Sequence, residues 1–343
     1  MNQTYLVIDG SQGEGGGQVL RSSLSLAMCL GRSIEIKNIR AGRKKSGLLR
    51  QHLTCVKAAQ EICQANVEGA ELGAKEISFQ PHQIKAGKYH FNIGTAGSTN
   101  LVFQTILPAL LQAKEISEVC LEGGTHNMHA PSYEYINHCF LPVLAKMNLA
   151  IQCEILRYGF YPKGGGKWVA YIQPSIEAKK LKLLKRGSLL SCKARALIAK
   201  IPLHVSQREL AEVHRQLDWL DNDLIEQEVD SSGSGNIISL QLTYQHCNTA
   251  FEAVAQRGIR AEQVAINAIT QLLKYQYSNA VVDEHLSDQL LLPMVLNQGG
   301  EFITHALSQH TKTNIAVINQ FIPDAITISN MDVDTVKVIV KGA

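Results

Sequence analysis

Arginines near the start of this 343-residue sequence and one histidine near its end are the side chains best suited to phosphate chemistry. Arg21 follows a glycine-rich turn, and Arg40 and Arg43 lie in the next glycine-containing loop. A guanidinium fork binds phosphate through two parallel hydrogen bonds, so arginines that converge at one end of a sheet would hold a polyanion. Gln51 and His52 follow these arginines on an expected helix and are further candidates for the same role.

His310 is the candidate nucleophile. It ends a polar loop, and the pattern of apolar residues predicts a helix over 314–321 directly after it. A negatively charged adduct at that place would be stabilised by a helix N-terminus. Neutral imidazole can attack phosphorus, so the position favours covalent catalysis, although a helix cap or an exposed histidine would look the same.

Carboxylates and amides supply the other candidate groups. Glu14 lies in the first glycine turn, and Asp288 near the start of an expected helix is a candidate ligand for a divalent cation. Asp288 could equally be an acidic residue favoured by the helix dipole. His126 and His129 are three residues apart, a spacing that could bind a metal, but the sequence shows no obvious third ligand.

The stretch from Asp9 to Arg21 must position several of these groups. A short apolar run leads into it and an apolar helical run leaves it, which predicts strand, tight turn and helix. Its glycines allow backbone N–H groups to approach an anion closely. The spacing fits neither a P-loop nor the G-x-G-x-x-G fingerprint.

The order of elements suggests three related β-α-β-α-β-β units, and therefore an α/β (α+β) fold class. The first unit is expected to close with strands near 76–79 and 89–93, and the second to restart at Gly94. The third is expected to begin at about residue 280. We therefore predict a large catalytic domain of residues 1–180 plus 280–343, and a small inserted α+β domain of residues 181–279.

Composition is that of a globular protein, with 45% apolar residues, 18% charged residues and a net charge of +3. Any nucleic-acid contact must therefore come from local basic clusters. No apolar run reaches the ~18 residues that a membrane span needs, and no basic-then-apolar leader precedes the first strand. Eight cysteines without C-x-x-C pairing indicate reduced thiols, so we expect a cytoplasmic protein. No heptad points to an obligate protein partner.

Several motifs resemble those of the RNA 3′-terminal phosphate cyclase family. The similarity covers nearly the full length, and the motifs that carry it are residues 9–21, 39–43, 47–52, Gly97-Ser98 with Gln104, Gly123-Gly-Thr125 with Ala130-Pro131, 158–166, 285–289, and His310 with Thr313-Asn314. The stretches 13–21 and 40–52 are the most specific of them.

This resemblance implies an enzyme built from three such units, as in the enolpyruvate transferases, with a smaller inserted domain. The enzyme would use ATP and a divalent cation, Mg²⁺ or Mn²⁺. A histidine would attack the α-phosphate of ATP and form a histidine-AMP adduct. AMP would then pass to an RNA 3′-phosphate, and the neighbouring 2′-hydroxyl would close a 2′,3′-cyclic phosphate.

The resemblance also assigns roles, residue by residue. His310 would be the nucleophile, and Glu14 and Asp288 would hold the metal. The bound nucleotide would lie near Gln104, Pro131, His285, Leu286, Ser287, Asp288 and Gln289. Phosphates of the RNA end or of ATP would bind Arg21, Arg40, Arg43, Gln51 and His52.

Two alternatives remain at this point. One is a non-catalytic RNA-processing relative of the cyclases, which would lack the nucleophilic histidine. The other is an enolpyruvyl transferase, which shares the repeats but needs no histidine-AMP. The presence of His310 together with Arg40 and Arg43 argues against the first. The expected inserted domain argues against the second, because enolpyruvyl transferases lack it at this point.

Overall fold

The computed structural model describes residues 5–343, in which three four-stranded sheets share one connection pattern. In each of them the first strand is parallel to the second, the second is antiparallel to the fourth, and the fourth is antiparallel to the third. Helices connect the first strand to the second and the second to the third. The three predicted β-α-β-α-β-β units are therefore confirmed.

The elements of the first unit are β1 (Leu6–Asp9), α1 (Gly17–Leu30), β2 (Ile34–Lys37), α2 (Arg50–Cys63), β3 (Asn66–Glu68) and β4 (Ile77–Gln80). Those of the second are β5 (Lys88–Asn92), α3 (Thr99–Leu111), β6 (Ser117–Gly123), α4 (Tyr133–Tyr135), the π-helical turn η1 (Ile136–Phe140), α5 (Leu141–Lys146), β7 (Ile151–Arg157) and β8 (Gly166–Ile172). Those of the third are β9 (Leu181–Leu183), α8 (Glu284–Val295), β14 (Gly299–His305), α9 (Gln309–Phe321), β15 (Ile326–Asn330) and β16 (Thr335–Lys341).

Two predicted boundaries between units were wrong. The strand near 89–93 does not close the first unit, because β5 pairs with β6 and so opens the second. The third unit begins at β9 rather than near residue 280, because β9 pairs in parallel with β14. Residues 181–183 therefore belong to the third sheet, whereas the sequence placed them in the inserted segment. A strand of three residues has no recognisable period, and its partner lies far along the chain.

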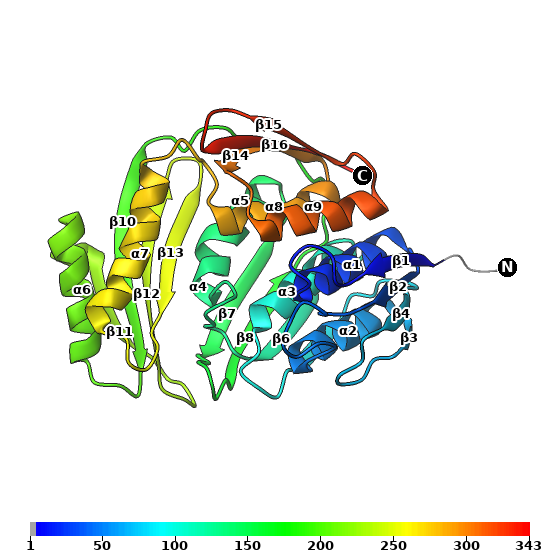
Figure 1. Ribbon diagram of the computed structural model, residues 1–343, viewed down its shortest axis with the longest axis horizontal. Coiled ribbons are helices and arrows are strands. Elements are labelled where there is room, and N and C mark those ends of the chain that lie inside the picture. The colour runs from blue at the N-terminus through cyan, green and yellow to red at the C-terminus, as the bar shows by residue number, and fades with distance from the viewer. Residues whose placement is uncertain (1–4) are drawn as a thin grey trace.

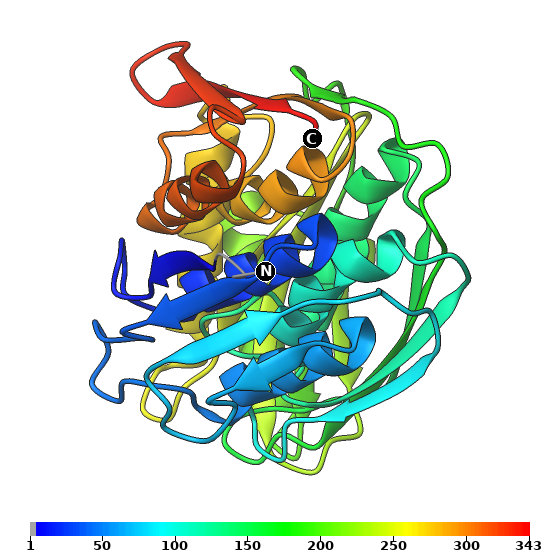
Figure 2. The same ribbon diagram turned by 90° about the vertical axis from the view of Figure 1, so that its right-hand side faces the viewer.

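The helices of the three units pack together in the centre, and the sheets surround them (Figure 1). Helix α1 contacts α2, α3 and α9, so helices of all three units meet around it. Helix α3 is buried on almost all sides, which explains why its sequence is apolar without a polar face. Figure 2 shows the first sheet on the outside of this helical layer.

The inserted segment forms its own sheet in the order β11-β10-β12-β13. Its elements are β10 (Leu189–Ala199), α6 (His204–Leu217), the 3-10 turn η2 (Asp221–Asp223), β11 (Leu224–Glu228), β12 (Gly235–Tyr244), β13 (Asn248–Val254) and α7 (Ala261–Gln276). Helices α6 and α7 bury Val213 and Ile269 against Ile238 and Leu240 of β12 in a separate apolar core.

Arg186 ties the two ends of this insert together. It precedes β10, and its guanidinium donates to the carbonyl oxygens of Tyr275 at 2.7 Å and Ser278 at 2.8 Å, at the end of α7. The same group lies 3.9 Å from the centre of the Tyr275 ring, a cation–π contact. The chain therefore enters and leaves the insert at one place.

Within residues 5–343, no helix combines the length and the apolarity that crossing a bilayer requires. All eight cysteines, which fall in this described part of the chain, are free.

Candidate active site

A cavity of about 490 Å³ lies where helices of all three units meet the insert. Seven predicted site residues line it, namely Arg21, Gln104, Pro131, His285, Asp288, Gln289 and His310. Leu286 and Ser287 do not face it. Leu286 is fully buried in the main core, and the Ser287 hydroxyl donates to the Glu284 carbonyl oxygen within α8.

The first glycine turn brings side chains of distant segments close together. A Cβ at Gly13 would lie 2.1 Å from Oγ1 of Thr313, and one at Gly17 would lie 2.4 Å from Nε2 of His52. The glycines are therefore needed because α9 and α2 approach the turn too closely for a side chain. This contact between the first and third units places Glu14 beside His310.

His310 differs from its predicted position, because α9 begins earlier than expected. Ser308 is the N-cap, and its Oγ accepts from the Thr311 N–H at 3.1 Å, so His310 lies in the first helical turn rather than before the helix. Its Nε2 is 3.2 Å from Oε2 of Glu14, and its side chain is 54% exposed. The ring can thus reach a ligand in the cavity while remaining at the positive end of α9.

Asp288 belongs to a chain of hydrogen bonds that crosses three helices. Its Oδ1 accepts from Nδ2 of Asn314 at 2.9 Å, and Oδ1 of Asn314 accepts from the Ser22 hydroxyl at 2.7 Å. Gln18 donates to Ser22 and accepts from Arg21. Burial raises the pKa of Asp288, and Asn314 opposes that shift. Asp288 lies beyond the first turn of α8, whose N-cap is Asp283, so the dipole explanation does not apply.

The predicted arginines do not all face a ligand. Arg43 is 3.2 Å from Glu14, and its side chain is 48% exposed at the mouth of the turn. Arg40 instead has a left-handed backbone and donates to the carbonyl oxygens of Lys45 and Gly47. Arg40 therefore fixes the shape of the basic loop. Burial lowers the pKa of Arg21, which lines the cavity.

Gln51 and His52 lie beside the glycine turn and the start of α3. Oε1 of Gln51 accepts from the Ser98 N–H at 2.7 Å, which anchors the residue that caps α3. Burial, and then the charges of Arg21 and Arg40, lower the pKa of His52 to about 3. His52 is therefore neutral at physiological pH and could contact a phosphate only as a hydrogen-bond donor.

Three amide atoms at the cavity wall have no hydrogen-bond partner among the described residues. They are Nε2 of Gln104, Oε1 of Gln289 and Oδ1 of Asn127, and all three are buried. Buried polar groups of native proteins are nearly always paired. An unpaired donor and two unpaired acceptors therefore suit a polar ligand in this cavity.

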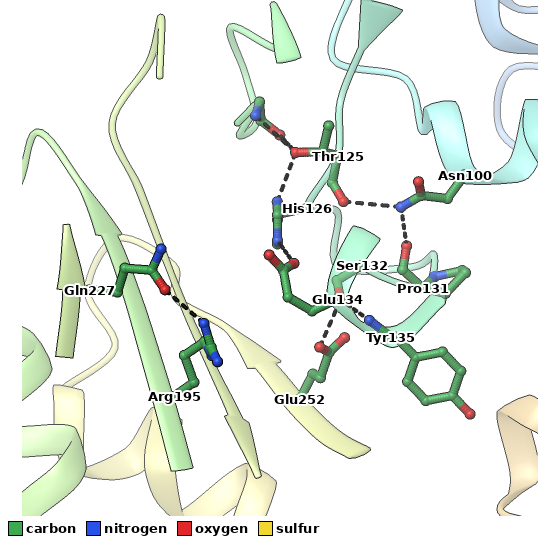
Figure 3. Close-up of polar contacts among 11 residues, drawn as sticks. Asn100, Thr125, His126, Pro131, Ser132, Glu134, Tyr135, Arg195, Gln227 and Glu252 are labelled. Carbon is green, nitrogen blue, oxygen red and sulfur yellow. Dashed lines mark hydrogen bonds and ion pairs between the residues drawn. The ribbon is translucent and has the colours of Figure 1, made fainter. Parts of the chain in front are cut away.

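The loop Asn127–Pro131 lines the cavity on the side of the second unit. Nδ2 of Asn100 holds both of its ends, donating to the carbonyl oxygens of Thr125 at 3.1 Å and Pro131 at 2.7 Å (Figure 3). Sequence reasoning missed Asn100, and also Glu252, which reaches the cavity from the insert. Glu252 gave no signal because its strand lies in a segment with no expected catalytic motif.

The spacing of His126 and His129 is not matched by a cluster of metal ligands among the described residues. His126 is fully buried and paired with Glu134. Among the described residues, three potential ligands that lie close enough together for one ion are His90, Cys120 and Glu122, and none of them lines the cavity.

Fold and site together define a three-unit α/β protein whose central cavity is lined by His310, Asp288 and Arg21, with Glu14 in contact with His310. The sequence model of the family described as RNA 3′-terminal phosphate cyclase matches residues 12–328. The chain is 47% identical over 324 residues to an RNA 3′-terminal phosphate cyclase of Pseudomonas fluorescens, covering 94% of each chain. It is 44% identical over 318 residues to that of Salmonella typhimurium, covering 93% of this chain and 94% of the relative. This protein therefore belongs to the RNA 3′-terminal phosphate cyclase family.

Solved structures similar to the fold include the enolpyruvyl transferase NikO from Streptomyces tendae. That match covers 98% of this chain and 48% of the other, with 8% identity and a TM-score of 0.38. An EPSP synthase from Acinetobacter baumannii matches with 12% identity and a TM-score of 0.31, over 95% of this chain and 62% of the other. At these scores, the strand order itself remains the better description of the fold.

Proposed function

We propose that the protein converts an RNA 3′-terminal phosphate to a 2′,3′-cyclic phosphate, using ATP and passing through a histidine-AMP adduct on His310. Membership of the cyclase family supports the overall reaction. The observation that carries the mechanism is the position of His310, in the first turn of α9 and on the wall of the cavity. A phosphoryl group bound there would lie at the positive end of a helix.

The first step forms a bond between a ring nitrogen of His310 and the α-phosphorus of ATP, and pyrophosphate leaves. An oxygen of the RNA 3′-phosphate then attacks the same phosphorus, and the P–N bond breaks. In the last step the 2′-hydroxyl oxygen attacks the 3′-phosphorus, loses its proton, and releases AMP. Activation by AMP is needed because an unactivated phosphate monoester oxygen is a poor leaving group.

The described residues fit these substrates. A cavity of about 490 Å³ is of the size that small-molecule ligands occupy. The unpaired Gln104 and Gln289 amides would contact the nucleotide, beside Pro131 and His285. Arg21 and Arg43 would contact phosphates, and His52 would donate a hydrogen bond. We expect Arg40 and Gln51 to act through the loop and the helix start that they hold.

Glu14 and Asp288 are the residues that would hold a divalent cation, with Mg²⁺ or Mn²⁺ suiting carboxylate oxygens. Such a cation would neutralise phosphate charge when bound. Glu14 now contacts Nε2 of His310, so that nitrogen must be released before it can attack. Binding of a cation to Glu14 and attack by His310 are therefore linked.

Adduct formation tests this proposal. The protein is incubated with α-labelled ATP and a divalent cation, and the expected result is an acid-labile label that His310→Ala abolishes. Cyclisation is then compared between an RNA with a 3′-phosphate end and one with a 3′-hydroxyl end. A labelled His310→Ala protein would overturn the mechanism, and equal inertness of both RNAs would favour a non-catalytic RNA-processing relative. We expect the reaction to take place in the cytoplasm, where the free cysteines would stay reduced.

A further inference from the structure

A buried histidine–glutamate pair lies immediately behind the cavity loop Asn127–Pro131. Nε2 of His126 contacts Oε2 of Glu134, and Nδ1 of the same ring lies 2.8 Å from Oγ1 of Thr125 (Figure 3). His126 is fully buried and Glu134 is 6% exposed. Neither residue has a part in the proposed reaction, yet a buried ionisable pair needs good geometry to offset its desolvation.

The pair brackets the loop along the chain. His126 is the last residue before Asn127, and Glu134 lies in α4, just after the loop ends. A contact between the two side chains therefore closes the base of the loop. Asn100 closes the same base through its two backbone contacts, so the loop has little freedom to move away from the cavity.

Aromatic rings fix the imidazole from the side of the insert. The His126 ring stacks on Tyr158 and Phe160, with ring centres 5.4 and 5.1 Å apart. Phe160 packs with Leu197 and Ile237 of the insert in a small separate core. Burial, and then the charge of the Glu134 carboxylate, raise the pKa of Tyr158 to about 12. The imidazole is therefore held by groups that also contact the insert.

A second link joins the end of the loop to the insert. The Ser132 hydroxyl donates to Oε1 of Glu252 at 2.7 Å, and Ser132 also caps α4. Glu252 lies in β13 and lines the cavity. The insert thus contacts the loop both behind the imidazole and at Ser132.

We propose that His126 and Glu134 are positioning residues, which fix the Asn127–Pro131 loop relative to the insert at the nucleotide cavity. This inference rests on the proposed function only where it predicts ATP affinity. It assigns the insert a role, namely completing one wall of the cavity through a loop of the second unit. Neither residue touches the reacting atoms.

The first measurement needs no nucleotide. Amide hydrogen exchange of residues 123–135 is compared between the native chain, His126→Gln, Glu134→Gln and the double variant. Each single substitution should speed exchange of the loop amides about tenfold, which corresponds to losing an interaction of modest strength. The double variant, in which two amides can pair, should recover part of the protection. If a single variant fails to fold, loop exchange can still be measured in the double variant.

The second measurement is the dissociation constant of ATP, determined in the His310→Ala background so that no adduct forms. Both single variants should bind ATP about tenfold more weakly, and the two effects should not add. The control is a pair outside the cavity, the exposed His90 and the half-buried Glu122, whose side chains are 3.2 Å apart on β5 and β6. His90→Gln and Glu122→Gln should leave loop exchange and ATP affinity unchanged.

Folded variants with native loop exchange would overturn the proposal. Faster exchange with unchanged ATP affinity would also overturn it, because the pair would then be structural only. A His310→Ala protein that binds no ATP would instead count against the proposed function, and the exchange measurement would still decide the positioning role.

Discussion

At the scale of single residues, Gly13 and Gly31 form a matched pair. Their φ angles are 62° and 63°, but a Cβ at Gly13 would meet Thr313 whereas a Cβ at Gly31 would meet nothing within 4 Å. Gly31→Ala should therefore cost only the left-handed penalty of about 1 kcal/mol. Gly13→Ala should cost more and should also displace the first turn of α9, which carries His310. We expect adduct formation to fall at least about tenfold in Gly13→Ala alone.

Urea unfolding and labelling with α-labelled ATP would measure the two effects. The idea fails if Gly31→Ala and Gly13→Ala lose equal stability and equal activity, because the contact with Thr313 would then be irrelevant.

At the scale of elements, Asp283 joins three parts of the fold. Its Oδ1 accepts from the N–H groups of His285 and Leu286 and from the Tyr135 hydroxyl, and its Oδ2 accepts from the Thr249 hydroxyl. Asp283→Ala would leave buried donors of the second unit and the insert unpaired. We expect a loss of about 3 kcal/mol, against about 1 kcal/mol for Ser308→Ala, which removes the cap of α9.

Chemical denaturation of both variants would measure this difference. Similar losses for Asp283→Ala and Ser308→Ala would show that the contacts to Tyr135 and Thr249 add nothing beyond a helix cap.

Helix α6 of the insert carries a buried carboxyl with a predictable pH effect. Burial raises the pKa of Glu209 from 4.5 to about 7, and Asn236 opposes the shift through one hydrogen bond. Because the folded pKa is the higher one, the stability linked to Glu209 is complete below pH 4.5 and is lost as the pH rises through 7. Glu209→Gln removes this loss and keeps an acceptor for Asn236.

The expected result is that Glu209→Gln gains stability relative to the native chain between pH 5 and pH 8, by at most about 3 kcal/mol. Urea unfolding at the two pH values would measure it. A difference between the two proteins that does not change with pH would contradict the prediction.

At the scale of the whole molecule, the cavity joins all three units and the insert, so a ligand there should stabilise the entire chain. ATP at one hundred times its dissociation constant would raise the free energy of unfolding by about 2.7 kcal/mol. His310→Ala should retain this stabilisation, because in the proposed mechanism the imidazole forms the adduct and other residues supply most of the binding contacts. Thermal unfolding with and without ATP would measure it, and an unchanged midpoint in both proteins would contradict a nucleotide site in this cavity.

Much of this architecture could be predicted because each unit repeats the same order of strand and helix patterns in the sequence. The glycine turn at Gly13 and the position of His310 near a helix start were visible in the same way. The start of α9 was misplaced because residues 309–313 are polar, and only the Ser308 cap reveals them as helical. The role of Arg40 could not be predicted, because the sequence is the same whether an arginine stabilises its own loop or binds phosphate.

Other parts of the site depend on side-chain contacts that no local pattern reveals. His126 met Glu134 across a loop, and Glu252 reached the cavity from the insert, so neither has a local signature. The pairing of β9 with β14 was hidden for the same reason.

Arg186 has a consequence for the order in which the chain folds. β9 is synthesised before the insert and β14 after it, so the third sheet cannot close until the whole insert has been made. An unfolded connection would oppose that closure with its chain entropy. Once the insert has formed its own core and Arg186 has joined its two ends, β9 and α8 are connected by a short, rigid path. The insert should therefore fold first, and His310, the proposed nucleophile, should be the last part of the candidate site to be placed.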